Sequence, residues 1–269
     1  QLVLGYLLGY FVIATVLMPM YYKLNLTSIY TYLDKRFGKS SYKTGASFFL
    51  LSRLIGSAFR LFLVANVLQI TVFEPLGIPF EISVFTTILL IWLYTLKGGI
   101  KTIIWTDTLQ ALFMLTAVGA TIIIIAKQLD LNLVSLIDTV IDNPHSKTFY
   151  FGSFNEKYHF IKQFFAGAFI AIVMTGLDQE MMQKNLSCKN IKDAQKNMFW
   201  FSIILVPVNL MFMSLGVLLV VFAQKNGIDI PARTDNLYPM IATQGYISPM
   251  VGIIFIIGLV AAAYSSADS

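Results

Sequence analysis

Charged residues are scarce in this chain, and their scarcity excludes most classes of protein. Only 12% of the 269 residues are charged and 57% are hydrophobic, with a mean hydropathy of +0.73. Soluble globular chains carry about 25% charged and roughly 45–50% apolar residues. The balance excludes a disordered chain, a nucleic-acid-binding module and an ordinary cytosolic enzyme. It is typical of an all-α integral membrane protein that crosses the lipid bilayer several times.

Cysteine and histidine are nearly absent as well. Cys188 is the single cysteine, and His145 and His159 are the two histidines. One cysteine excludes a disulfide framework and a cysteine-based zinc or iron–sulfur site. The apolar stretches also carry no His, Cys and Asp set at helical spacing that could form a nucleophile–base pair or a metal cluster. We therefore expect a protein that is not an enzyme and that has no nucleic-acid partner.

The chain is instead rich in apolar stretches of membrane-spanning length. A bilayer core about 30 Å thick needs roughly 20 mostly apolar residues per helix. Seven stretches approach this length, at about residues 1–22, 44–73, 82–96, 106–126, 160–177, 199–223 and 248–269. No Gly/Ser-rich or Pro-rich linker separates them, so we expect one transmembrane domain over residues 1–269. Because apolar sequence runs into both ends of the chain, we expect this domain to be incomplete at both ends.

Lysine and arginine residues fall mainly in alternate loops, and this asymmetry orients the helices. The first, third and fifth loops carry eleven of these residues, whereas the second, fourth and sixth carry five. Cytoplasmic loops of membrane proteins carry an excess of lysine and arginine. We therefore expect the first loop, residues 23–43, to face the cytoplasm and the first span to run from outside to inside.

Two arginines interrupt the second apolar stretch. Arg53 and Arg60 are seven residues apart and so lie on one face of a helix. An ionisable residue within a membrane is costly, by about 3 kcal/mol on insertion scales, and usually faces the bundle interior or an aqueous path. Either arginine could bind an anionic substrate, because the guanidinium group matches the geometry of a carboxylate. Either could instead snorkel or form a structural pair, which is what we expect for Arg53.

Two other groups of polar residues could bind a cation. Asp107 and Gln110 share a helix face, and Asp107 could ligate a cation, relay a proton or cap the start of its helix. In the closing AAAYSSADS, small residues recur at spacings of three or four and gather on one side of a helix. They are Ala262, Ser265, Ser266 and Ser269. Hydroxyl and carbonyl oxygens suit a small alkali cation, but small residues also pack helices together in membranes.

A further polar segment, MTGLDQEMMQK, follows the fifth apolar stretch. It places Gly176 beside Asp178, Gln179 and Glu180. A glycine among polar residues is compatible with a broken helix, which transporters use at binding sites, and also with a plain helix end. Here we expect the plain end.

Four sequence blocks together resemble the sodium:solute symporter family. They are TSIYTYLDKRFG, GGIKTIIWTDTLQ, LDQEMMQKNLSCKN and GLVAAAYSSADS, in the family's order and over nearly the whole chain. The resemblance implies a LeuT-type helical bundle of two inverted five-helix repeats, of which this chain covers about core helices two to eight. It also implies secondary active transport, in which downhill entry of sodium (Na+) drives the uptake of a small organic solute.

The resemblance also implies ligands for sodium. The family's common sodium site has its matching positions on core helix eight at Ala262, through the backbone carbonyl, and at Ser265 and Ser266, through the hydroxyls. Some members have a second sodium site, which is matched here by Asp107 together with Ser265, Ser266 and Ser269. Asp268 stands where that branch can have another serine.

Arg60 matches the position at which sialic acid transporters place an arginine that binds the substrate carboxylate. We therefore expect a carboxylate-bearing solute, sialic acid-like or another organic anion. Two departures from the family accompany this match: Leu7 stands where a polar partner is expected, and Ile203 where sugar carriers have a lysine. The remaining alternatives are a symporter of a neutral sugar, polyol or amino acid, a proton-coupled relative using Asp107, and a symporter-like sensor domain of a larger signalling protein. We expect the protein in a bacterial inner membrane.

Overall fold

The computed structural model describes the backbone of residues 1–26, 28–95 and 100–268. Side chains are described over the same ranges except at residues 91, 94–95, 100–104, 106, 145 and 260–268. The described residues form helices joined by turns and contain no strand, as the composition predicts. Their contacts divide the chain into two compact units, Gln1–Leu51 with Pro144–Leu210 and Ser52–Asn143 with Met211–Ser269.

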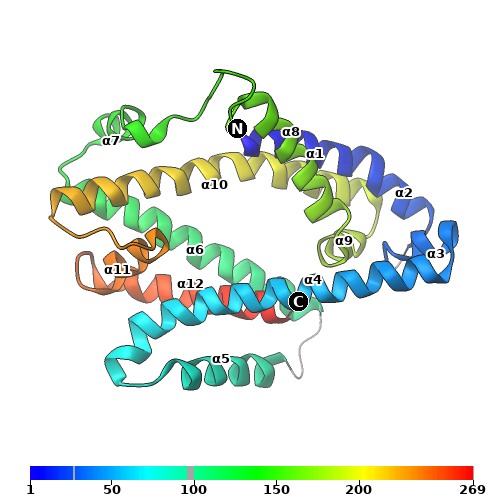
Figure 1. Ribbon diagram of the computed structural model, residues 1–269, viewed down its shortest axis with the longest axis horizontal. Helices are drawn as coiled ribbons and strands as arrows, with labels where there is room; N and C mark the ends of the chain where they lie inside the picture. Colours follow the sequence, from blue (N-terminus) through cyan, green and yellow to red (C-terminus); the bar gives the residue numbers. More distant parts are fainter. Residues whose placement is uncertain (27, 96–99, 269) are drawn as a thin grey trace. The chain divides into compact units, whose positions relative to one another are not determined.

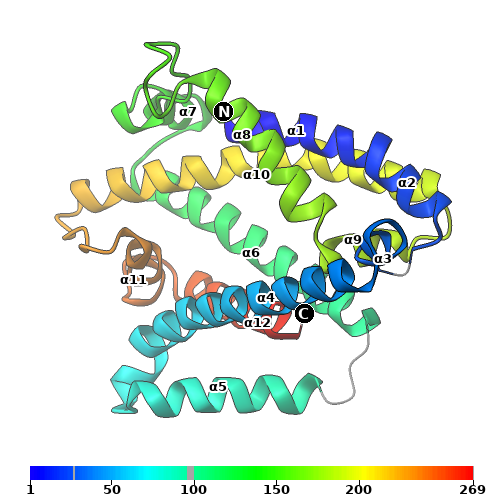
Figure 2. The same cartoon turned by 45° about the vertical axis from the view of Figure 1, so that its right-hand side comes forward.

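The first unit is built on a pair of long helices. One consists of α1 (Leu2–Val12), the π-helical η1 (Ile13–Leu17) and α2 (Met18–Lys23). The other consists of α8 (Phe160–Ala171) and the π-helical η5 (Ile172–Gly176), and α1 lies directly against α8 (Figures 1 and 2). The unit also contains α3 (Thr31–Phe37), α9 (Gln179–Leu186) and the first parts of α4 (Lys39–Leu68) and α10 (Ile191–Lys225).

Glycines let the backbones of α1 and α8 touch. A Cβ atom on Gly5 would overlap the carbonyl oxygen of Phe164, and one on Gly167 would overlap the carbonyl oxygen of Leu2. A Cβ on Gly9 would lie 2.6 Å from both the carbonyl oxygen of Ala168 and the Cβ of Ala171. Gly5 and Gly9 are four residues apart, which is the small-residue spacing that lets membrane helices approach closely.

The core of the first unit lies along the second half of the first helix and the segments that follow it. Its fully or nearly fully buried side chains include Ile13, Met18 and Tyr21 from the first helix and Met182 from α9. Met198 of α10 completes the contact. α9 is therefore held by apolar packing against α2 as well as by its own chain connection.

The second unit is built on the pair α6 (Ile100–Gln128) and α12 (Pro249–Asp268), which pack along each other and run in opposite directions (Figures 1 and 2). α5 (Phe80–Thr95), α7 (Leu133–Ile141) and α11 (Leu237–Thr243) belong to the same unit. Its core contains the fully buried Ile125, Leu218 and Ile241. The hydroxyls of Thr121 and Tyr238 lie 2.9 Å apart, so one donates to the other and α11 is tied to α6.

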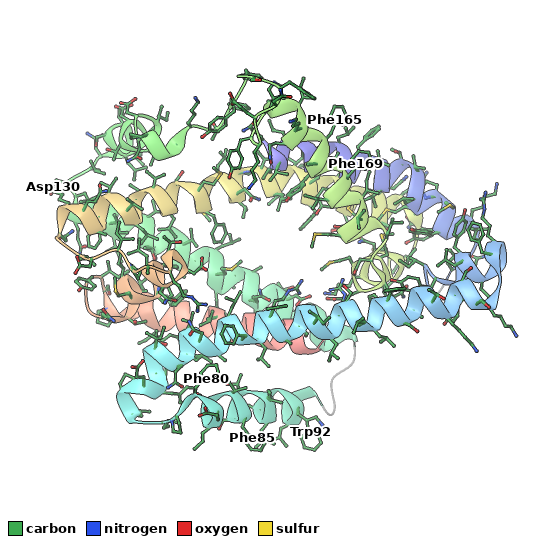
Figure 3. The ribbon with its side chains drawn as sticks, viewed as in Figure 1. Phe80, Phe85, Trp92, Asp130, Phe165 and Phe169 are labelled. Carbon is green, nitrogen blue, oxygen red and sulfur yellow. The ribbon has the colours of Figure 1, made fainter. Side chains whose placement is uncertain are left out.

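All seven predicted spans coincide with helices, and most of them are long enough to cross a bilayer. Among the described residues, four helices pass by length and hydropathy, and a fifth passes if the bent pair of α8–η5 and α9 is one span. The remaining two predicted spans contain shorter apolar helices, Phe80–Leu90 and Pro249–Leu259. Large side chains such as Phe85 and Trp92 on α5 and Phe165 and Phe169 on α8 are 51–67% exposed (Figure 3). Exposed aromatic surface of this extent is typical of helices that face lipid or other helices.

Candidate functional site

The fifth span is broken where polar residues enter it. η5 ends at Gly176, α9 begins at Gln179, and the two helical parts are bent by 68°. The plain helix end expected from the sequence is therefore wrong, because the chain resumes a helix after only Leu177 and Asp178. The side chain of Asp178 explains the restart: it caps α9 by accepting a hydrogen bond from the amide of Met181 at 3.1 Å.

Groups near the start of the chain form hydrogen bonds on both sides of this break. The hydroxyl of Tyr21 donates to the carbonyl oxygen of Gly176 at 2.9 Å, and Tyr21 is only 2% exposed. The amide of Ile29 donates to the side-chain oxygen of Gln179 at 2.9 Å. The break is thus attached at both sides, to α2 through Gly176 and to the loop after α2 through Gln179.

The first helix carries its own irregular turn next to the break. η1 contacts η5, and a Cβ on Gly176 would lie 2.6 Å from Leu17 Cδ1 and 2.9 Å from Ile13 Cγ1. A π-helical turn leaves a backbone carbonyl without its usual partner, and such turns are frequent at functional sites. The side chain of Gln195 on α10 supplies a donor to the carbonyl oxygen of Ala14 at 2.7 Å. Two π-helical turns, η1 and η5, therefore contact each other beside the break. In each of them a backbone carbonyl accepts a hydrogen bond from a side chain.

The far end of α9 has a second attachment. The hydroxyl of Tyr22 lies 3.1 Å from the carbonyl oxygen of Asn185 and 3.4 Å from that of Cys188, and it can donate to either.

Burial, and next the carboxylate of Asp193, raise the pKa of the Cys188 thiol above its ordinary value. The thiol of the chain's only cysteine is therefore protonated and poorly nucleophilic at neutral pH.

The structure brings together the two helices that carry the predicted sodium ligands. A Cβ on Gly258 of α12 would lie 3.4 Å from the amide nitrogen of Met114 on α6, so the helices are in close contact there. Asp107 lies seven residues before Met114, and Ser265 lies seven residues after Gly258. Because the helices run in opposite directions, Asp107 and Ser265 lie at about the same level, roughly 10 Å from that contact.

The individual side chains of this group are described only in part. Asp107 is half-buried on α6. The side chains of Ala262, Ser265 and Ser266 lie outside the described residues, although their backbone belongs to α12, and Ser269 lies outside them altogether. The set of sodium ligands therefore remains a prediction from the sequence.

The two arginines of α4 differ in their surroundings. Arg60 is exposed, and Arg53 is half-buried. Both belong to the second unit, with α5, α6 and α12.

Several known proteins that resemble this chain are sodium-coupled cotransporters or symporters. Residues 1–266 match the model of the sodium:solute symporter family. The human sodium/iodide cotransporter is 25% identical over 203 residues, which are 71% of this chain and 29% of that protein. The sodium/sialic acid symporter NanT of Aliivibrio fischeri is 27% identical over 257 residues, which are 93% of this chain and 49% of that protein.

A solved structure shows the same fold. It is the substrate-bound outward-open state of a Na+-coupled sialic acid symporter, with a TM-score of 0.84 and 23% sequence identity, and the match covers 99% of this chain and 57% of that one. The chain therefore has the LeuT-type helical fold that its sequence blocks predict, and it spans less than half the length of the curated relatives above. With the family model matching almost every residue, the chain belongs to the sodium:solute symporter family and is part of an integral, multi-pass membrane protein.

Proposed function

We propose that the whole protein is a sodium-coupled symporter that imports a small organic anion, with a carboxylate as the recognised group. The observation that carries the sodium part is the pairing of α6 with α12, which brings Asp107 level with Ser265 on antiparallel neighbouring helices. A carboxylate and several hydroxyls on facing helices form the hard-oxygen environment that small cations prefer. We place the protein in a bacterial inner membrane, where an inward sodium gradient can drive uptake.

Two sodium positions are proposed. The first uses the backbone carbonyl of Ala262 and the hydroxyls of Ser265 and Ser266. The second uses Asp107 with Ser265, Ser266 and Ser269. Binding of the positive charge between helices favours the solute-ready form, and solute and sodium then increase each other's affinity reciprocally.

The solute part rests on the charge of Arg60 and on the nature of the relatives' cargo. Iodide, monocarboxylates and sialic acid appear in the names of similar cotransporters, and each is an anion. An anion in a membrane protein needs a compensating positive group, and Arg60 offers a guanidinium that can bind a carboxylate through two parallel hydrogen bonds.

The proposed transport cycle follows from these parts. Sodium binds first and stabilises the outward-open form, and the solute then binds near mid-membrane with its carboxylate on Arg60. The bundle rocks to open inwards, sodium leaves past Ser265 and Ser266, and the solute follows. Moving one charge through 100 mV is worth about 2.3 kcal/mol, so a negative interior accelerates uptake.

Sodium is expected to stabilise the purified full-length protein against heat. A ligand that binds only the folded state adds about 2.7 kcal/mol at a concentration one hundred times its Kd. We therefore expect a higher Tm in sodium chloride than in choline chloride at equal ionic strength. The measurement is a thermal unfolding series in detergent with increasing sodium.

Two variants at one position serve as controls for this series. Ser266→Ala removes a proposed ligand hydroxyl and should shift the sodium dependence of Tm to higher concentrations by about tenfold, equivalent to about 1.4 kcal/mol. Ser266→Thr keeps a hydroxyl and should behave much more like the wild type. Equal Tm values in sodium and choline for the wild type would contradict the cation site and favour the proton-coupled alternative.

A further inference from the structure

We propose that Tyr21 is a positioning residue for transport: its hydroxyl sets the geometry of the helix break by holding the carbonyl of Gly176. The proposal rests on the proposed function, because it assigns to Tyr21 a role in shaping a broken helix, the feature that transporters use at binding sites. It adds a residue from α2, outside the ligand sets described above.

The contact has the properties of a fixed attachment. The Tyr21 hydroxyl lies 2.9 Å from the Gly176 carbonyl oxygen, and the two residues are 155 positions apart in the chain. The ring is 2% exposed and packs in the same core as Met18 and Met182. A buried side chain with a single hydrogen-bonded orientation has little freedom, so the position of the Gly176 carbonyl is determined by α2.

The Gly176 carbonyl needs this donor because the helix ends there. After Gly176 the backbone leaves the helix, and Asp178 has the extended conformation with φ −100° and ψ 126°. The last carbonyls of a helix have no partner within it and must find one elsewhere. Gly176 and Tyr21 are buried, so water cannot easily serve there, an unpaired carbonyl is costly, and the Tyr21 hydroxyl stabilises this particular bend.

The neighbouring contacts extend the attachment along the whole of α9. At the start of α9, the side chain of Gln179 accepts a hydrogen bond from the amide of Ile29. Near the end of α9, the hydroxyl of Tyr22 donates to the carbonyl of Asn185. α9 therefore follows α2 and the loop after it as one body. A movement of α2 would therefore change the bend at Gly176.

A purely structural tyrosine would make the same hydrogen bond, so the test needs a readout that stability alone does not move. The variant is Tyr21→Phe, which keeps the ring in the core and removes only the hydroxyl. Tyr6→Phe is the matched control, because it removes a hydroxyl from the same helix about four turns away from the break. Tyr22→Phe tests whether the effect depends on where along α9 the hydroxyl is lost, because the Tyr22 hydroxyl contacts the end of α9 that is farther from the break.

The first measurement is hydrogen–deuterium exchange of the full-length protein in detergent, which reports local opening of backbone amides. Tyr21→Phe is expected to accelerate exchange in residues 177–182 by about tenfold, since a buried carbonyl loses its donor. Tyr22→Phe should accelerate exchange only around residues 185–188, and Tyr6→Phe in neither segment. Unchanged exchange at 177–182 in Tyr21→Phe would overturn the attachment itself.

The second measurement is sodium-driven uptake in proteoliposomes at varied solute concentration. Tyr21→Phe is expected to raise the solute KM by about tenfold, the loss of affinity expected for a mispositioned site. Faster exchange with an unchanged KM would overturn the positioning role and leave Tyr21 a structural residue. A wild type that carries no solute overturns the proposed function and with it the transport role of Tyr21, while the exchange data still decide whether Tyr21 holds the break.

Discussion

Replacing Gly5 with leucine is expected to prevent the protein from accumulating in a folded form. Even a single Cβ at this position overlaps the carbonyl oxygen of Phe164, so the clash is with the backbone of α8 and no rotamer change relieves it. Overpacking costs about 1–3 kcal/mol where side chains can adjust, and more where they cannot. Separating α1 from α8 would also remove the contact on which the first unit is built.

The measurement is the monodisperse fraction of full-length protein in detergent, by size-exclusion chromatography, together with its Tm. Gly216→Leu is the matched control, because Gly216 is exposed on α10 and a Cβ there has no atom within 4 Å. We expect the control to behave like the wild type. A Gly5→Leu protein with wild-type yield and Tm would contradict the close packing of α1 and α8.

Replacing Arg60 with glutamine is expected to raise the KM for a carboxylate solute by about tenfold to a hundredfold. The reason is that hydrogen bonds to charged groups contribute about 1.5–3 kcal/mol, and glutamine retains neither the charge nor the paired donors of a guanidinium. The measurement is uptake by the full-length protein in proteoliposomes with an inward sodium gradient. Arg60→Lys keeps the charge but lacks the planar pair of donors, so its KM should lie between that of the wild type and that of Arg60→Gln.

The control for Arg60 comes from the same helix face. Arg53 lies seven residues earlier and is half-buried, and we expect it to be structural. Arg53→Gln should therefore lower the folded yield more than it changes KM. If Arg60→Gln leaves the carboxylate KM unchanged, Arg60 does not bind the solute, and a neutral sugar, polyol or amino acid becomes the better candidate.

Hydropathy predicts the helices well because each span must bury a length of apolar chain in lipid. Every one of the seven apolar stretches contains a helix, and the boundaries at residues 160–177 agree with α8 and η5 to one residue. The helix α7 was not predicted, since nine residues are too short for a span. Its signal was nevertheless present: Asn132 caps it by accepting from the amide of Ser135 at 2.9 Å, and an apolar run follows.

Irregular turns could not be predicted because they depend on distant partners. Gly176 and Asp178 alone are compatible with a helix end or a break, and the Tyr21 hydroxyl that stabilises the bend lies 155 residues away. The π-helical turn at Ile13–Leu17 likewise depends on Gln195, which supplies the donor for Ala14. No local pattern in either segment carries this information.

In the candidate site, too, local sequence indicates the residue types, whereas the contact between helices comes only from the structure. Spacing alone left Asp107 as a ligand, a proton relay or a cap, and the resemblance assigned it to sodium. The structure adds the antiparallel contact of α6 and α12 that brings it level with Ser265. The serine side chains and the solute-binding role of Arg60 remain assignments from the resemblance, and the variants at Ser266 and Arg60 test them separately.

The most direct test of the central proposal is solute uptake by the full-length protein in proteoliposomes, with and without an inward sodium gradient. The solutes are labelled sialic acid, a monocarboxylate, a neutral sugar and proline, and choline replaces sodium at fixed pH. We expect accumulation of an acidic solute only with the sodium gradient, and faster accumulation when the interior is made negative. Uptake that proceeds equally in choline would contradict sodium coupling.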